Sequence, residues 1–212
     1  MPVPRPDPAA EPLGERLVLT TLDLLAEEGL DALTLRHIAR RAGVSHGAPL
    51  RHFRSRGDLL AEVAARGFAM LSESVEKSAA QLGPDAGPRE RLRAGSRAYV
   101  EAALARPGLF ALMFRPELLD AENPSFVAQG TAAFEQLLAQ VRAAQASGWH
   151  LERDSRLLAG GVWSALHGLA SLWTQGAFAV PVPNASLDDA IDTTLDLMTG
   201  DLPKGVAPGG IR

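Results

Sequence analysis

The chain of 212 residues contains no cysteine. This absence excludes disulfide bonds, thiol catalysis and zinc sites with cysteine ligands. The sequence also lacks a run of about 18 apolar residues, the length that a membrane span requires. No apolar stretch behind its first residues resembles the core of a signal peptide. We therefore expect a cytoplasmic protein that is not exported and has no membrane partner.

Motifs for catalysis are missing as well. The sequence shows no nucleophile elbow, no glycine-rich phosphate loop after a strand and no metal-binding spacing on a helix. A small helical enzyme remains an alternative, because His150 lies close to Glu152 and Asp154, and such a pair could transfer protons. These residues form no complete catalytic set. The sequence predicts a protein that is not an enzyme and that binds no metal and no cofactor.

Alternation of apolar and polar residues, the mark of a strand, is absent too, whereas helical spacing is frequent. Leu17, Thr21 and Leu24 share one face of a first helix, which Gly29 ends. Beyond the Gly/Pro-rich loop after Gln81, the pattern predicts helices at residues 88–105, 107–114, about 123–147, 154–175 and 187–199. The predicted fold is all-α, with a small N-terminal three-helix unit joined by a long helix to a larger helical bundle.

What the chain does have is a local concentration of positive charge. Residues 31–66 hold seven arginines and three acidic residues, a net charge of +4, which leaves −8 for the rest of a chain whose total is −4. A basic module on an acidic body is typical of a surface that binds a polyanion. A solvated charged face is the alternative interpretation of the same charges.

The basic stretch also has the spacing of a helix-turn-helix. Thr34 can cap a helix with Ile38 and Ala39 on its inner face, and Gly43 then supplies a tight turn. Ser45 caps a second, very short helix. Two short helices at a steep angle are the geometry that lays a helix in the major groove of DNA, with caps and basic groups on the phosphates.

A long helix follows this motif. Ser55 and Asp58 form a capping box at its start, and it extends to about Gln81. Its inner side is predicted to consist of Leu60, Val63, Ala64, Gly67, Met70, Leu71 and Val75.

The stretch "LDALTLRHIARRAGVSHGAPLRHFRSRGDLL" resembles the N-terminal DNA-binding domain of the TetR/AcrR family of bacterial regulators. The features of that family appear in order as Thr34, Ile38-Ala39, Ala42-Gly43-Val44-Ser45, His52-Phe53 and Ser55-Arg56. The resemblance implies that one group of residues holds the DNA backbone: Thr34, Arg36, Ser45, Arg51, His52 and Arg56. It implies that a second group, His46, Gly47 and Ala48, faces the bases and selects the sequence.

The chain departs from the family at Pro49-Leu50, where a Leu or Ile followed by Tyr is usual. That Tyr commonly touches a phosphate, and Leu50 cannot donate a hydrogen bond. Pro49 biases Ala48 away from helical angles, which predicts a distorted start of the recognition helix.

The helix predicted at 154–175 is apolar on two sides. At helical spacing one side carries the large residues Trp163, Leu166, His167, Ala170, Trp173 and Thr174, which suit the interior of the bundle. The other side carries small residues and allows a helix of a partner subunit to approach closely. With two residues of the last helix, which Ser186 caps, the predicted dimer interface is Gly161, Ser164, Ala165, Gly168, Leu172, Ile191 and Leu195.

The segments "LARPGLFALMFRPEL" and "GVWSALHGLASLW" resemble a sub-group of the TetR/AcrR family with a Trp-x-x-x-His-Gly signature, here Trp163, His167 and Gly168. This resemblance implies a dimer formed through the last two helices and a ligand pocket inside each bundle. Candidates for the pocket wall are Tyr99, Phe110, Met113, Phe114, Phe134, Trp163, His167 and Trp173. His167 could serve as a structural histidine, a ligand contact or a metal ligand.

Together these patterns predict a homodimeric transcriptional regulator, a repressor released from a palindromic double-stranded DNA operator by a small hydrophobic or aromatic effector. A DNA-binding dimer without an effector is the alternative. The predicted organisation is a disordered arm (1–11), a helix-turn-helix domain (12–57), a ligand-binding and dimerisation domain (58–200) and a disordered tail (201–212).

Overall fold

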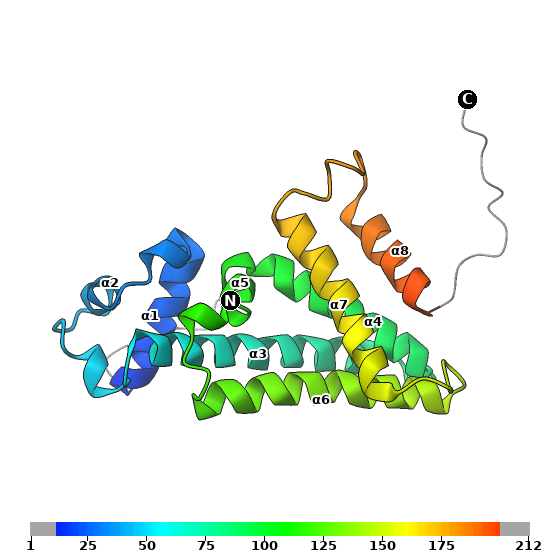
Figure 1. The fold of residues 1–212 in the computed structure, drawn as a ribbon, viewed down its shortest axis with the longest axis horizontal. Helices are drawn as coiled ribbons and strands as arrows, with labels where there is room; N and C mark the ends of the chain where they lie inside the picture. Colours follow the sequence, from blue (N-terminus) through cyan, green and yellow to red (C-terminus); the bar gives the residue numbers. More distant parts are fainter. Residues whose placement is uncertain (1–11, 200–212) are drawn as a thin grey trace. The chain divides into compact units, whose positions relative to one another are not determined.

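The computed structural model describes residues 12–199, and every regular element in that range is helical (Figure 1). The α-helices are α1 (Leu13–Glu28), α2 (Leu35–Arg41), α3 (Arg56–Gln81), α4 (Pro88–Ala105), α5 (Pro107–Met113), α6 (Pro124–Ala146), α7 (Ser155–Thr174) and α8 (Leu187–Thr199). Three short 3-10 helices are η1 (Leu30–Ala32), η2 (Pro49–Arg51) and η3 (Pro116–Leu118). The all-α prediction is confirmed. The arm and the tail that the sequence predicts lie outside the described residues.

The helix boundaries follow from local hydrogen bonds. The hydroxyl of Ser55 accepts the N–H of Asp58 at 3.0 Å at the start of α3, and the hydroxyl of Ser186 accepts the N–H of Asp189 at 3.1 Å at the start of α8. Asp154 caps α7 by accepting two backbone N–H groups of its first turn. None of the helices within residues 12–199 combines the length and the apolar character needed to cross a membrane.

The chain divides into two compact units. The described parts of the first are residues 12–72 and 105–133, and those of the second are residues 73–104 and 134–199. This division differs from the predicted boundary after residue 57, because the segment that leads into α6 packs with the N-terminal helices. Both α3 and α6 continue from one unit into the other.

In the first unit, the inner face of α3 packs against the N-terminal helices and α5. Leu17 and Leu24 of α1 and Ile38 of α2 are fully buried, as are Leu60 and Val63 of α3. Gly67 of α3 lies so close to α5 that an added Cβ would force the side chain of Met113 to shift. The interior of this unit is therefore built from the first three α-helices and from α5, which comes much later in the chain.

A buried polar cluster explains why residues 105–133 belong to the first unit. Nδ2 of Asn123 donates to the carboxylate of Asp58 at 2.9 Å and to the carboxylate of Glu62 at 3.0 Å. The same Asp58 carboxylate accepts the backbone N–H of Arg54 at 2.8 Å. Burial raises the pKa of Asp58, but the hydrogen bonds from Asn123 and Arg54 outweigh this effect and hold the pKa below its ordinary value.

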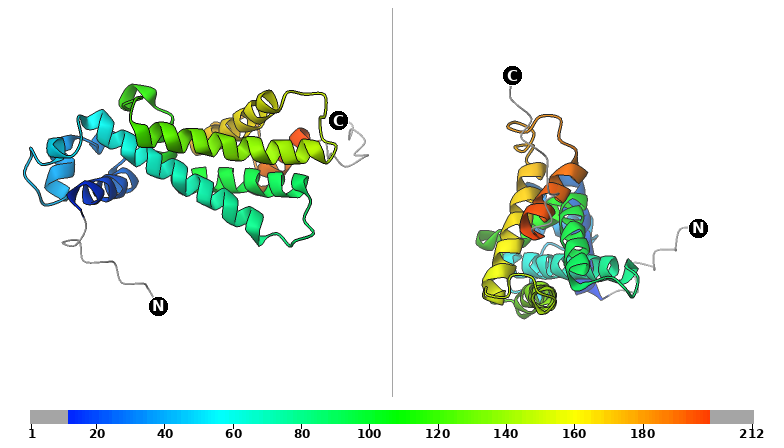
Figure 2. Two further views of the ribbon diagram at one scale, coloured as in Figure 1. Left: turned by 90° about the horizontal axis from the view of Figure 1, so that it is seen from below. Right: turned by 90° about the vertical axis from the view of Figure 1, so that its right-hand side faces the viewer.

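In the second unit, α7 and α8 lie side by side (Figure 2). α7 buries Val162, Leu166 and Leu169, and α8 buries Ile191 and Leu195. Two arginines of α4 fix α8 by ion pairs: Arg93 with Asp192 and Asp196, and Arg97 with Asp188 and Asp192, at 2.6–2.9 Å.

Gly67→Ala tests the close approach of α3 and α5. A Cβ at Gly67 would lie 2.6 Å from Sδ of the buried Met113 and 3.1 Å from Leu109, so we expect a loss of about 1–3 kcal/mol in unfolding free energy. Gly130→Ala is the matched control, because its Cβ would meet Phe68 at an ordinary 3.6 Å and we expect a gain of about 0.5–1 kcal/mol. Urea unfolding followed by circular dichroism measures both. Equal effects of the two substitutions would contradict this packing.

Candidate functional site

The turn of the helix-turn-helix is built as the sequence predicts. The hydroxyl of Thr34 accepts the N–H of His37 at 3.2 Å and caps α2. Gly43 has a φ of +69°, in the left-handed region that glycine adopts without strain. Its N–H donates to the carbonyl of Arg40, and the N–H of Val44 donates to the carbonyl of Ala39, which closes the end of α2 and reverses the chain.

The segment after the turn differs from the prediction. Ser45 does not begin an α-helix: its carbonyl accepts the N–H of Ala48 at 2.9 Å in a turn, and the short 3-10 helix η2 follows. Pro49 has no N–H to donate to an α-helical ladder, which is the physical reason for the tighter turn. Ala48 itself keeps helical angles, with φ −61° and ψ −42°, so the predicted bias of this residue away from them is wrong. The recognition element of this chain is therefore a turn and one 3-10 helix rather than a regular helix.

Most of the residues predicted to touch DNA are on the surface. Thr34, Arg36, Ser45, His46, Gly47, Arg51 and His52 are exposed. Ala48 is not: only 7 % of it is exposed, and Pro49 beside it is buried too, which argues against its predicted contact with the bases. Arg56 is half-buried, and its Nε donates to the backbone carbonyl of Leu33, which leaves only its other nitrogens for a phosphate.

Leu50 is the residue that sequence reasoning missed at this surface. It is 56 % exposed, next to the exposed Arg51, while its neighbours Ala48 and Pro49 are buried. The unusual Pro49-Leu50 pair marks this position in the sequence as different from the family. The amino-acid order alone, however, does not show which of the two residues faces the solvent. A leucine in the major groove can contact only apolar groups, of which the methyl group of thymine is the main one.

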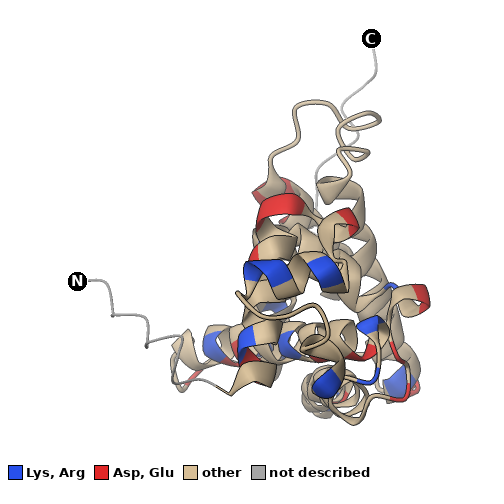
Figure 3. Ribbon diagram, turned by 90° about the vertical axis from the view of Figure 1, so that its left-hand side faces the viewer, with Lys and Arg blue, Asp and Glu red and all other residues tan. Residues whose placement is uncertain are grey.

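Acidic neighbours neutralise part of the basic charge. Figure 3, viewed from the end with α1 and α2, shows Lys and Arg segments in blue beside Asp and Glu segments in red. Arg41 pairs with Glu27 and Glu28, and Arg54 pairs with Asp58 and with Asp120 at 2.8 Å. Among residues 12–199, Arg36 and Arg51 form no such ion pair and are exposed. Of the arginines predicted to touch DNA, these two are the most accessible positive charges for a phosphate.

A chain of hydrogen bonds links three predicted ligand contacts in the second unit. The indole Nε1 of Trp163 donates to the hydroxyl oxygen of Tyr99 at 3.1 Å, and this oxygen lies 3.1 Å from Nδ1 of His167. Because an indole N–H can only donate, the hydroxyl oxygen of Tyr99 accepts from Trp163. The direction of its hydrogen bond with Nδ1 of His167 depends on the tautomer of the imidazole.

Burial keeps the hydrogen-bonded side chains of Tyr99 and His167 neutral. It raises the pKa of the Tyr99 hydroxyl, although the hydrogen bond from Trp163 acts in the opposite direction. It lowers the pKa of His167 below the ordinary value of a histidine. At neutral pH both groups are therefore uncharged.

The other predicted ligand contacts fall into separate clusters. The ring of Phe134 lies 6.3 Å from that of Trp163 in the second unit, beside the hydrogen-bonded chain. Phe110 and Phe114 lie together in the first unit, with ring centroids 5.2 Å apart, and Met113 is buried in that unit. Trp173 packs on Phe178 at 5.4 Å. The structure thus brings four of the eight residues together: Tyr99, Phe134, Trp163 and His167.

The predicted dimer residues divide between the surface and the interior. On α7, Gly161, Ser164 and Leu172 are exposed, and Ala165 and Gly168 are half-buried. Ile191 and Leu195 of α8 are each only 1 % exposed within a single chain, so they have no surface left for a partner and their prediction is corrected. Two residues outside the predicted interface set, Leu157 on α7 and Leu197 on α8, are 79 % and 66 % exposed.

Two family models match the chain. The model described as "Bacterial regulatory proteins, tetR family" matches residues 17–63, and the model described as "Tetracyclin repressor-like, C-terminal domain" matches residues 92–198. The chain belongs to the tetR family. No curated protein matches it. The sub-group with the Trp-x-x-x-His-Gly signature stays a prediction.

Solved structures resemble the chain over most of its length. A protein of unknown function from Rhodococcus sp. RHA1 is 31 % identical, with a TM-score of 0.77, over 90 % of this chain and 95 % of that one. The TetR family transcriptional regulator PfmR from Thermus thermophilus is 23 % identical, with a TM-score of 0.65, over 89 % and 100 %. The fatty acid degradation regulator FadR from Bacillus halodurans is 16 % identical, with a TM-score of 0.69, over 91 % and 97 %.

Membership of the tetR family decides the general class of this protein. Members of the family are transcription regulators that bind DNA, not enzymes. The helix-turn-helix of this regulator lies inside the matched residues 17–63. The hydrogen-bonded residues Tyr99, Trp163 and His167 lie inside the matched residues 92–198.

The stability of this tetR-family regulator should fall as the pH drops below about 6.5, the ordinary pKa of histidine. Since burial lowers the pKa of His167, the unfolded chain takes up this proton at a higher pH than the folded chain. Above about pH 6.5, His167 is neutral in both the folded and the unfolded state. Below it, the unfolding free energy falls until the pH reaches the lowered pKa that His167 has in the folded state. Urea unfolding at about pH 7.5 and about pH 5.5 measures the loss.

His167→Asn is the matched variant for this pH dependence. An asparagine oxygen can accept the hydroxyl proton of Tyr99 near the position of Nδ1, but it does not titrate. We expect a smaller loss of unfolding free energy between the two pH values in this variant. An unchanged loss would show that His167 is not the group responsible.

Proposed function

We propose that this chain is a homodimeric repressor that leaves a palindromic operator when a small hydrophobic or aromatic molecule binds its second unit. The observation that carries the DNA-binding part is the exposed surface around the Gly43 turn. Arg36 and Arg51, which form no ion pair within the described part of the chain, are exposed in this segment, and so are His46 and Leu50.

The contacts with DNA divide into two kinds. Arg36, Arg51 and His52, with the hydroxyls of Thr34 and Ser45, position the protein on the phosphates. His46 and Gly47 face the bases, and Leu50 adds an apolar contact with a thymine methyl group. Only the second group selects the operator sequence.

The exposed side of α7 is suited to pairing with a second copy. An added Cβ at Gly160, Gly161 or Gly168 would meet nothing within 4 Å, so this side has no neighbour among residues 12–199 and can be approached closely. Leu157 at one end of it and Leu197 on α8 are large apolar residues in contact with water. Their burial against a twofold-related copy is the driving force of the proposed dimer.

The effector is expected to carry a polar group on an apolar body. Phe134 and Trp163 supply aromatic surface, and the hydrogen-bonded chain from Tyr99 to His167 places polar atoms beside it, a combination typical of small-molecule sites. Binding shifts the population toward a conformer in which α3, which runs through both units, pivots and changes the spacing of the two recognition elements. Coupling of this kind is reciprocal, so operator DNA weakens effector binding by the same factor.

Arg51→Ala and His46→Ala separate the two kinds of DNA contact. Arg51→Ala should weaken binding to all sequences and reduce the slope of log K against log salt by about 1, because one phosphate contact is lost. His46→Ala should change which base is preferred at one operator position, at a cost of about 1–3 kcal/mol for the original sequence. Fluorescence anisotropy with the DNA upstream of the gene and with a scrambled duplex, at several salt concentrations, measures both.

Arg142→Ala is the control for this experiment, because Arg142 is an exposed arginine on α6 outside the helix-turn-helix. We expect it to leave DNA binding unchanged. Equal losses on every sequence for Arg51→Ala and His46→Ala would refute the division of the contacts. Weak binding of the unmodified protein to both duplexes, lost together as salt rises, would refute the proposed repressor itself.

Leu157→Glu tests the dimer. A carboxylate in the proposed interface would be buried next to its twofold-related copy, so we expect sedimentation equilibrium to show monomers where the unmodified protein forms dimers. Val180→Glu, at an 83 % exposed site away from α7, is the control and should leave the dimer intact. A dimer that persists in Leu157→Glu, with unchanged helical content, would mean that another surface forms it.

A further inference from the structure

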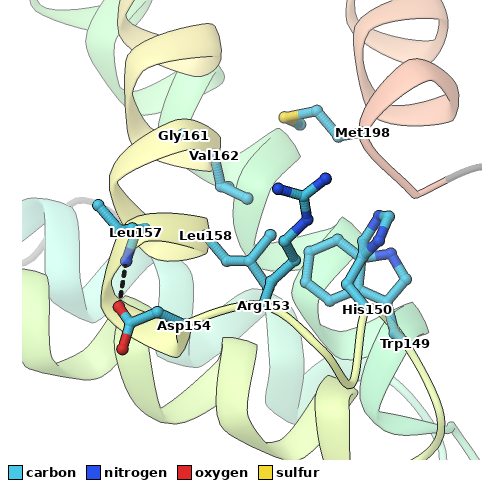
Figure 4. Close-up of a pocket in the computed structure, with 9 residues that line it drawn as sticks. All are labelled: Trp149, His150, Arg153, Asp154, Leu157, Leu158, Gly161, Val162 and Met198. Carbon is cyan, nitrogen blue, oxygen red and sulfur yellow. Dashed lines mark hydrogen bonds between the residues drawn. The ribbon is translucent and has the colours of Figure 1, made fainter.

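A cavity of about 400 Å³ opens beside the N-terminal half of α7 (Figure 4). It is enclosed by the loop that joins α6 to α7, by α7 and by Met198 of α8, all within the second unit. None of the residues predicted to bind the effector lines it. Its size is in the range of small-molecule sites.

The loop at this cavity is held rigidly by one buried side chain. The amide of Gln145 donates to the backbone carbonyls of His150 and Arg153, at 3.0 and 2.9 Å. Its carbonyl accepts the hydroxyl proton of Ser155 at 2.6 Å. Both donors and the acceptor of Gln145 are thus used to shape the loop. A loop backbone fixed in this way lowers the entropy cost of ordering the loop when a ligand binds.

Two adjacent residues of the loop carry features that are often found at functional sites. His150 has a φ of +45°, a conformation that costs free energy for a residue other than glycine. Trp149 packs edge-on against the ring of His150 at 4.8 Å and is buried. Its indole N–H has no hydrogen-bond partner among residues 12–199. A buried donor without an acceptor is unfavourable, and a bound acceptor would relieve it.

The other walls combine two charged residues, Arg153 and Asp154, with apolar surface. The guanidinium of Arg153 extends over the cavity toward Met198, and the side chains of Leu158 and Val162 form the facing wall (Figure 4). The carboxylate of Asp154 is used by the cap of α7, where it accepts two backbone N–H groups. Nε of Arg153 forms an exposed ion pair with Glu152 at 3.7 Å, which is beyond hydrogen-bond distance, so its guanidinium can still donate hydrogen bonds to another anion.

We propose that this cavity is a second small-molecule site, and that it binds an organic anion consisting of a carboxylate on a short apolar chain. The carboxylate accepts hydrogen bonds from the guanidinium of Arg153, and the chain lies along Leu158, Val162 and Met198. This site is separate from the one formed by Tyr99, Trp163 and His167. It does not depend on the proposed repressor function.

Octanoate is the probe, with octanol and octylammonium as its neutral and cationic counterparts. The full-length protein is labelled with ¹³C at the methionine methyl groups and ¹⁵N throughout. We expect octanoate to shift the Met198 methyl signal and the Trp149 indole signal in a saturable way. Octanol should bind about tenfold more weakly, and octylammonium should cause no saturable shift. The Met113 methyl group, in the first unit, should not respond.

Arg153→Gln removes the charge without changing the apolar walls. We expect octanoate to bind this variant about tenfold more weakly, with octanol unaffected. Arg153→Lys should restore part of the affinity, because it keeps the charge but not the fork of donors. Arg142→Gln removes the same charge from an exposed position of the same unit and should leave the affinity unchanged.

Three results would overturn this assignment. Equal responses to octanoate and octylammonium, or equal losses in Arg153→Gln and Arg142→Gln, would show that Arg153 does not select an anion. Shifts at Trp163 with none at Trp149 would place octanoate at the effector site instead. Leu157 and Gly161 belong both to the wall of the cavity and to the proposed dimer surface. A Met198 signal that changes with protein concentration but not with octanoate would therefore show that a second copy of the chain fills the cavity.

Discussion

The buried carboxylate of Asp58 is the interaction on which the first unit depends. It accepts the backbone N–H of Arg54 and the side-chain amide of Asn123, while its own N–H is capped by Ser55. Loss of the carboxylate would remove the acceptor of the Arg54 N–H and leave the amide of Asn123 with Glu62 as its remaining acceptor. One side chain therefore fixes the end of the DNA-reading segment, the start of α3 and the start of α6 in a single arrangement.

This constraint matters because the DNA-reading segment has little regular structure of its own. Between Gly43 and Arg54 the backbone forms a turn and one 3-10 helix, with few internal hydrogen bonds. Ala48, Pro49 and Phe53 are buried and anchor it from within. Its exposed side chains are thus held by packing and by the Asp58 cluster, so a change at the start of α6 can reach the DNA surface through a short chain of contacts.

In the second unit, polar contacts decide which apolar faces remain exposed. The ion pairs of Arg93 and Arg97 with three aspartates hold α8 on α4 and turn Ile191 into the interior. Leu197 and the small-residue side of α7 are left in contact with water. The surface proposed for the dimer is therefore a consequence of charges on α4, a helix that takes no part in that surface.

Features that depend on neighbours within a few residues could be predicted from the amino-acid order alone. The cap at Thr34, the left-handed turn at Gly43, the cap at Ser55 and the limits of the helices follow from hydrogen bonds inside one turn, and the structure contains each of them. The TetR/AcrR motif that surrounds these residues is likewise a contiguous stretch of sequence, so it could be recognised without the fold. The burial of Ala48 and Ile191, the exposure of Leu50 and the pairing of Asn123 with Asp58 emerged only from the folded chain. Periodicity shows which residues share a face, but burial depends on which distant segment covers that face, and those segments are brought together only when the chain folds.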